Sequence, residues 1–169
     1  MTDAPLPAED RDEKPAEAPA DAFDLRAETP AIDTYLALRP ACGMSGMSRE
    51  AAERGLPNTL YGVVLYHRGE PVGMGRLVGD DGCFFVVTDI CVLPRHQGLG
   101  LGKRIMEALS DEIDRRAPDA AYVSLIADGD AKYLYEKYGF TETAPASVGM
   151  ARYPLRKPWT DPAAPQPTR

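Results

Sequence analysis

The feature that most restricts the fold is a glycine-rich turn at residues 97–103, with the sequence QGLGLGK. Residues 83–92, just before it, have the apolar and β-branched composition of a strand. After the turn, apolar residues recur every four positions, which predicts an amphipathic helix. They are Leu101, Ile105, Leu109 and Ile113. Residues 121–126 are then expected to form a buried strand, parallel to the first because a helix crosses between them.

The segments on either side of this unit predict a mixed sheet with helices packed on it. Turn residues separate three antiparallel strands, and Gly73 and Gly75 within the second indicate close approach of another backbone or of a ligand. The expected strands are residues 23–27, 60–66, 72–78, 83–92, 121–126, 140–143 and 148–153. The expected helices are residues 30–38, 48–54, 101–115 and 130–138. The loop at residues 42–48 is either a connector with methionines packed inward or a mobile lip over a pocket.

Length and charge indicate one folded domain between two tails. The chain has 169 residues and a net charge of -7. Residues 1–21 hold seven acidic and two basic residues, so this Pro- and Ala-rich segment is predicted to be a disordered acidic tail. Residues 157–169 are interpreted as a Pro-rich tail, which leaves residues 22–156 as the domain. Without a secretory signal or an apolar run near the roughly 20 residues of a membrane helix, we expect a soluble, cytoplasmic chain.

The same composition argues against two kinds of ligand. No basic stripe provides the electrostatic footprint that a nucleic acid needs. Cys42, Cys83 and Cys91 are too widely spaced for a zinc knuckle or a CxxC pair, so they are interpreted as reduced thiols. His67 and His96 have no HxH or HxxxH companion. We therefore expect neither nucleic acid nor a metal ion as a partner.

The turn has the chemistry of an anion site. Backbone amides are free at the start of a helix, where the helix dipole is positive. Glycines at 98, 100 and 102 leave room for a diphosphate, and Lys103 adds positive charge. A plain tight turn would show the same glycines. The phosphate loop of nucleotide triphosphatases and the dinucleotide fingerprint both require other glycine spacings and fit poorly.

Three segments of the chain, taken in order, resemble the GNAT superfamily of acyl-CoA-dependent N-acyltransferases. Gln97, Gly100 and Gly102 match the signature of Gln or Arg, two residues, Gly, one residue, and Gly or Ala. The segments DICVLP at residues 89–94 and AKYLYEKYGF at residues 131–140 are also similar to that family. The resemblance implies an α/β (α+β) fold with a mixed, mainly antiparallel sheet of six to seven strands. The sheet would splay in the middle, with about four helices around it.

The resemblance implies that acetyl-CoA is the co-substrate. Its pantetheine arm would lie beside the strand before the turn and be bound by the backbone of Cys91, Val92 and Leu93. An amide near Cys91 or Val92 would face the thioester oxygen. The pyrophosphate would be held by Gln97, Gly98, Leu99, Gly100, Leu101, Gly102 and Lys103. Asp128 or Asp130 stands where many members of the family have an asparagine that binds pantetheine.

The resemblance also implies catalytic roles. Tyr135 matches a tyrosine that protonates the departing thiolate, although an ordinary helix aromatic would look the same. Asp89 is the candidate for holding or deprotonating the amine, and a structural carboxylate is its alternative. Glu53 or a water chain could act as the base instead. A covalent role for Cys91 is disfavoured because no base is placed beside it.

These observations predict acetyl transfer from acetyl-CoA to a primary amine of a small molecule, by direct attack in a ternary complex. Two other functions stay open: a non-catalytic acyl-CoA-binding regulatory module, and acetylation of a protein or peptide amine. A homodimer is compatible with either kind of protein.

Overall fold

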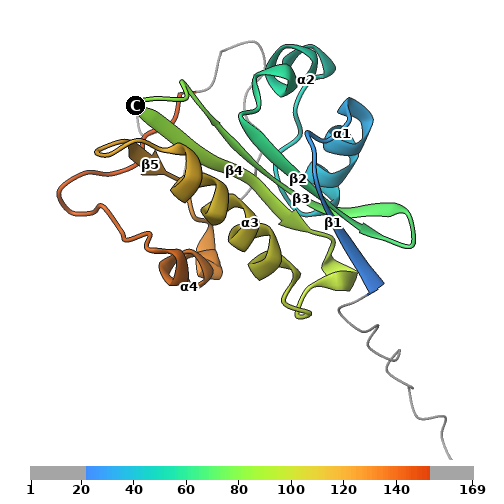
Figure 1. Ribbon diagram of the computed structural model, residues 1–169. Coiled ribbons are helices and arrows are strands. Elements are labelled where there is room, and N and C mark those ends of the chain that lie inside the picture. The colour runs from blue at the N-terminus through green and yellow to red at the C-terminus, as the bar shows by residue number, and fades with distance from the viewer. Residues whose placement is uncertain (1–21, 153–169) are drawn as a thin grey trace, which may run out of the picture.

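The computed structural model describes residues 22–152, and the chain folds around one five-stranded sheet with the order β1-β2-β3-β4-β5 (Figure 1). The predicted tails, residues 1–21 and 157–169, lie outside the described residues. Helix α3 crosses one face of the sheet with α4 beside it, and α1 and α2 lie on the opposite face. The predicted mixed sheet between helices is confirmed.

The first four strands form an antiparallel meander. β1 pairs with β2, β2 with β3 and β3 with β4, all antiparallel. The strands are β1 Phe23–Ala27, β2 Tyr61–His67, β3 Glu70–Gly79, β4 Phe84–Val92 and β5 Tyr122–Ser124. The predicted segments 23–27, 60–66, 72–78 and 83–92 therefore match the observed strands within two residues at their ends. Turn residues and the period of two located these strands because their partners are neighbours in the chain.

The helices begin and end near the predicted residues. They are α1 Ile32–Ala41, α2 Arg49–Gly55, α3 Leu101–Arg116 and α4 Lys132–Tyr135, with short 3-10 turns at Leu56–Asn58, Pro94–His96, Gly129–Ala131 and Glu136–Tyr138. The hydroxyl of Ser48 caps α2 by accepting a hydrogen bond from the N–H of Ala51 at 3.1 Å. The apolar stripe of α3 packs on the sheet, where Leu101, Ile105 and Leu109 are fully buried.

The two glycines of β3 are explained by close packing. A Cβ at Gly73 would lie 2.7 Å from the carbonyl oxygen of Cys91, and one at Gly75 would lie 2.5 Å from Ile105 of α3. Real Cβ atoms do not approach that closely, so larger residues would push α3 and β4 away from β3. The close approach predicted here is thus made by the protein's own backbone and by α3.

The sheet opens at the parallel pair. β5 pairs with β4 where residues 84–86 face residues 122–124, and within residues 22–152 no other strand pairs with the rest of β4 on that side. The splayed sheet is therefore present. The predicted strand at residues 121–126 is shorter than expected, and it is not buried, because Tyr122 is 52% exposed.

The two strands predicted after Gly139 were predicted wrongly. Residues 140–143 and 148–152 form no strand, and Tyr153 lies outside the described residues. Val148 and Met150 are 67% and 93% exposed, so the apolar alternation that suggested a strand has no surface to pack against. Strand propensity is expressed only where a neighbouring strand pairs with the segment. The sheet accordingly has five strands rather than six to seven.

The described residues form neither a membrane-spanning helix nor a cluster of metal ligands. None of the helices within residues 22–152 is both long and apolar enough to span a bilayer. In the same range, His, Cys, Asp and Glu side chains nowhere gather in a group of three or more that could hold a metal ion.

Candidate active site

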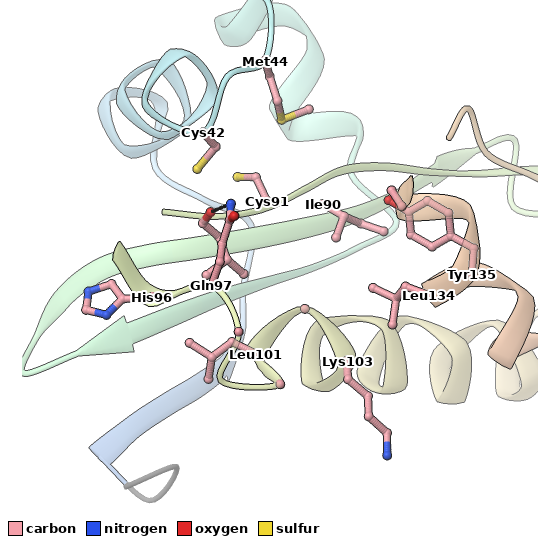
Figure 2. A pocket seen from close by; sticks show the side chains of 15 residues that line it. Cys42, Met44, Ile90, Cys91, His96, Gln97, Leu101, Lys103, Leu134 and Tyr135 are labelled. Carbon is pink, nitrogen blue, oxygen red and sulfur yellow. Dashed lines mark hydrogen bonds between the residues drawn. The ribbon is translucent and has the colours of Figure 1, made fainter. Parts of the chain in front are cut away.

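A pocket of about 480 Å³ lies where β4 extends beyond its pairing with β5 (Figure 2). It is bounded by the end of α1 and the following loop, by β4, by the glycine turn with the start of α3, and by α4. Its lining residues are Cys42, Met44, Ile90, Cys91, Val92, His96, Gln97, Gly98, Gly100, Leu101, Gly102, Lys103, Ala131, Leu134 and Tyr135. Most of the sequence-predicted site residues thus meet in one cavity. Leu93, Leu99, Asp89 and Asp128 are not among its lining residues.

The glycine turn presents open backbone at the start of α3. Gly98 and Gly100 have φ angles of 83° and 73°, in the left-handed region that favours glycine. A Cβ on either would meet no atom within 4 Å, so space is available beside the chain. Gly100 is the N-cap of α3 and provides no side-chain cap, and the first turn of the helix holds no acidic residue. The amides of this turn are therefore available to an anion.

Gln97 stabilises the turn through its side chain. Its side-chain amide donates to the carbonyl oxygen of Val92 at 2.9 Å, which ties the turn to the end of β4. The side chain is thus committed to the protein's own backbone. It stabilises the turn at the wall of the pocket.

The N–H of Leu93 is also bound within the protein, because it donates to the carbonyl oxygen of Val72 in β3 at 2.8 Å. N–H groups of successive strand residues point to alternate sides. The N–H of Cys91 is therefore directed toward β3, and that of Val92 toward the open edge and the pocket. Of the three residues predicted to bind pantetheine through their backbone, Val92 is the one whose N–H points toward the pocket, and contacts of Cys91 and Leu93 stay predictions.

A bulge in β4 arises at Asp89, which has a φ angle of 58°. The pairing of β3 with β4 shifts between Met74 and Arg76. A non-glycine residue at this φ needs strong local contacts to hold it. The bulge lets both Ile90 and Cys91 line the pocket, which strict alternation along a strand would not allow.

The contacts that hold the bulge form a buried ion network. Asp89 is 4% exposed. One carboxylate oxygen accepts from Nη1 of Arg39 and the other accepts from Nε of Arg76 at 2.7 Å. Arg39 also donates to the carbonyl oxygen of Ser45 at 2.8 Å, and Arg76 donates to the hydroxyl of Thr59 at 2.8 Å. Both oxygens of Asp89 are thus bound by cations.

These contacts favour the structural role that the sequence left open for Asp89. Both carboxylate oxygens are engaged by guanidinium groups, and Asp89 does not line the pocket, so it is not placed to contact a bound amine. Glu53, the other carboxylate considered, is exposed on α2 and does not line the pocket.

Tyr135 lies on α4 and points into the pocket beside Leu134 and Ile90 (Figure 2). Its side chain is 9% exposed. Burial, and to a lesser extent the negative charge of Asp128, raise the pKa of its hydroxyl above the usual 10.0. The hydroxyl therefore keeps its proton at neutral pH, as a proton donor must.

The other candidate residues of this region point elsewhere. Tyr133 is 56% exposed, and Tyr138 donates its hydroxyl to the carbonyl oxygen of Lys103 at 3.0 Å, which fastens α4 to α3. Asp128 is exposed and reaches the site only through its charge on Tyr135. The predicted contact between Asp128 and pantetheine stays a prediction.

Two thiols form part of the pocket wall. The sulfur atoms of Cys42 and Cys91 face one another across the gap between the end of α1 and β4 (Figure 2). The Cys42 thiol and burial raise the pKa of Cys91 far above its ordinary value. Cys91 therefore stays a protonated thiol.

Some lining residues were not singled out from sequence. Met44 and Cys42 come from the loop interpreted as a connector or lip, and Ala131 and Leu134 precede Tyr135 on the last helical segment. The only signal for them was their position beside predicted site residues. His96 also lines the pocket, and burial with the charge of Arg95 lowers the pKa of its imidazole.

Comparison with known proteins identifies the class. The family described as "Acetyltransferase (GNAT) domain" matches residues 41–150, which include the pocket and its glycine turn. The chain belongs to this family. The resemblance noted in the sequence is confirmed.

Particular relatives agree with this assignment. A crystal structure from meticillin-resistant Staphylococcus aureus, described as a "Probable Acetyltransferase", has 44% sequence identity and a TM-score of 0.74, over 78% of this chain and 98% of that one. The serotonin N-acetyltransferase 2 of Oryza sativa is 37% identical over 53% of this chain and 44% of its own length. An uncharacterised N-acetyltransferase of Porphyra purpurea is 34% identical over 49% and 47%. The chain spans about half the length of these curated relatives.

Proposed function

We propose that the chain transfers the acetyl group of acetyl-CoA to a primary amine of a small molecule, by direct attack in a ternary complex. The observation that carries this proposal is a single pocket that joins an anion-binding turn, an unpaired strand edge and a buried, protonated tyrosine. Each has a distinct task in thioester aminolysis.

The turn at residues 98–103 would bind the diphosphate of the co-substrate. The left-handed glycines keep side chains away from the backbone, and the uncapped amides of α3 supply donors at the positive end of the helix dipole. Lys103 adds a charge at the pocket wall. The residues present therefore fit a diphosphate in shape and in charge.

The free edge of β4 would bind the pantetheine arm and polarise the thioester. The N–H of Val92 is directed to this edge, and the carbonyl oxygen of Val92 is already held by Gln97. A fixed N–H aimed at an oxygen that becomes negative during attack lowers the barrier, because it needs no reorganisation.

Tyr135 would protonate the sulfur that leaves. A thiolate has a basicity comparable to that of a phenolate, so proton transfer is nearly balanced in energy. We assign removal of the proton from the amine to pocket water. Asp89 is not assigned this step, because both of its oxygens are bound by arginines. It instead stabilises the bulge that orients Ile90 and Cys91.

The acceptor end of the pocket favours an amine with an apolar body. Ile90 lies beside Tyr135, Cys42 and Met44 line the other side of the pocket, and no acidic side chain appears among the lining residues of the described chain. A second positive charge on the acceptor would therefore find no partner. A small arylalkylamine suits this wall better than a polyamine or a basic peptide.

The test is release of free thiol from acetyl-CoA with three acceptors: serotonin, spermidine and a lysine-containing peptide. Serotonin is expected to give the highest kcat/KM. Turnover of the peptide alone would reassign the protein to peptide acetylation. Saturable acetyl-CoA binding by calorimetry without thiol release on any amine would favour the non-catalytic module.

A further inference from the structure

The pair Cys42 and Cys91 has no part in the transfer reaction described above. The two residues are 49 positions apart in the chain, one at the C-terminal end of α1 and one near the end of β4. Both line the pocket, and their sulfur atoms face each other (Figure 2). The third cysteine, Cys83, is exposed and lies outside the pocket lining.

We propose that Cys42 and Cys91 form an oxidisable dithiol site inside the pocket, which a peroxide converts to an internal disulfide. The elements that carry the two thiols are already packed together, because α1 contacts β4 directly, and a hydrogen bond joins the two thiols. A disulfide requires two facing sulfur atoms and close Cβ atoms, and the two thiols already face one another.

The surroundings of the two thiols give them different roles. Cys42 is partly exposed to the pocket, and a hydrogen bond from the Cys91 thiol lowers its pKa. Cys91 is buried and remains protonated. Cys42 is therefore the thiol that ionises more readily and meets the oxidant, and Cys91 is the resolving thiol. A reactive thiolate beside a resolving cysteine is the arrangement found in redox-sensitive sites.

The chemistry balances with hydrogen peroxide as the oxidant. The Cys42 thiolate attacks one peroxide oxygen, the O–O bond breaks, and hydroxide leaves to take up a proton as water. The sulfenic acid on Cys42 is then attacked by the sulfur of Cys91. The S–S bond forms, the S–O bond breaks, and the oxygen leaves as water with the proton of Cys91. Two thiols and one peroxide give one disulfide and two waters.

The site would respond to the co-substrate, a point that rests on the proposed function. Cys42 meets solvent through the pocket that acetyl-CoA is proposed to fill. At about 100 times the Kd, only about 1% of pockets are open, so oxidation should slow by at least about tenfold. The disulfide would in turn fix the end of α1, and with it Met44, against the strand edge that binds the co-substrate.

The test uses the Cys83→Ser variant, in which the pair supplies both thiols. After peroxide, we expect loss of both titratable thiols, a mass lower by two hydrogens, a monomer on a non-reducing gel, and full recovery with dithiothreitol. Controls carry a second change, Cys42→Ser or Cys91→Ser. Cys91 alone should stay reduced, whereas Cys42 alone should gain oxygen. Thiols that survive peroxide sufficient to oxidise Cys83 in the wild type, or an intermolecular disulfide, would overturn the proposal.

Acetyl-CoA is then added before the peroxide. An unchanged oxidation rate with a calorimetrically saturated pocket would overturn the coupling. If calorimetry instead detects no acetyl-CoA binding at all, the proposed function fails, while disulfide formation in the free protein is judged separately by mass.

Discussion

At the scale of single residues, Tyr135 and Asp89 have opposite surroundings and are expected to fail in opposite ways. Tyr135 is buried and points into the pocket, whereas Asp89 is buried between two cations and does not line the pocket. Changing the first should affect turnover, and changing the second should affect stability.

Tyr135→Phe keeps the ring and removes the acidic proton. We expect kcat to fall by about 10²- to 10⁴-fold, the usual contribution of a general acid, with the Kd for acetyl-CoA nearly unchanged. Stopped-flow thiol release and calorimetry measure the two quantities. Tyr133→Phe is the matched control, because this neighbouring tyrosine is exposed. A fall in kcat for the control but not for Tyr135→Phe would place the acid elsewhere.

The raised pKa of Tyr135 sets the direction of the pH dependence. The acid form acts, so activity is retained below the pKa of the folded protein and lost above it. Because that pKa is raised above its ordinary value, the alkaline decline of kcat should lie at higher pH than an ordinary tyrosine would give, and it should be absent in Tyr135→Phe. A pH profile of both proteins provides the comparison. An alkaline decline that persists in the variant would assign it to another group.

Asp89→Asn removes the charge that balances Arg39 and Arg76. Breaking a buried ion pair by changing one partner usually costs about 3–5 kcal/mol, so we expect a loss of that size in the free energy of unfolding. Urea denaturation measures it. Asp24→Asn is the control, since its pair with Arg26 is largely exposed and the midpoint should hardly move. Unchanged stability with lost activity in Asp89→Asn would restore Asp89 as a chemical base.

At the scale of elements, the glycine turn and the start of α3 form the anion site. Gly100 has a positive φ, so any side chain there adds backbone strain to its effect on the ligand. Gly102 lies within the helix, and a Cβ on it would make only an ordinary contact with Leu134 at 3.6 Å. Gly102 is therefore the cleaner position for separating binding from folding.

Gly102→Glu should abolish acetyl-CoA binding without unfolding the protein, because a negative charge then occupies the start of α3. Gly102→Ala adds a methyl group without charge and should retain binding. Calorimetry with circular dichroism compares the two variants. Equal affinity of Gly102→Glu and the wild type would reject the diphosphate site.

The elements that sequence could predict are those stabilised by near neighbours in the chain. Hairpin turns fixed the meander, and a four-residue repeat fixed α3, because both patterns are local. The strands predicted at residues 140–143 and 148–153 failed because apolar alternation does not say whether a partner edge is present. The edge of β5 offers three residues, and Val148 and Met150 remain exposed.

At the scale of the whole molecule, the pocket depends on contacts between distant segments. Arg39 and Asp89 are 50 residues apart, and Cys42 and Cys91 are 49 apart. A periodic sequence pattern does not encode pairs so far apart in the chain. From the sequence, the role of Asp89 therefore stayed open, and the cysteines were interpreted as separate thiols. The glycine turn and Tyr135 could be predicted because a short motif carries each of them. The direction of the Val92 N–H, away from β3, could be inferred only from the observed register of β3 and β4.

The central claim is that acetyl groups pass directly from acetyl-CoA to an amine in this pocket. The most direct measurement uses acetyl-CoA with an isotopically labelled acetyl group and serotonin, with mass spectrometry of both the amine and the protein. The account predicts labelled N-acetyl product in equal amount to released thiol, and no label on Cys42 or Cys91 at any time. Label that appears first on either cysteine, or thiol release without labelled amide, would contradict it.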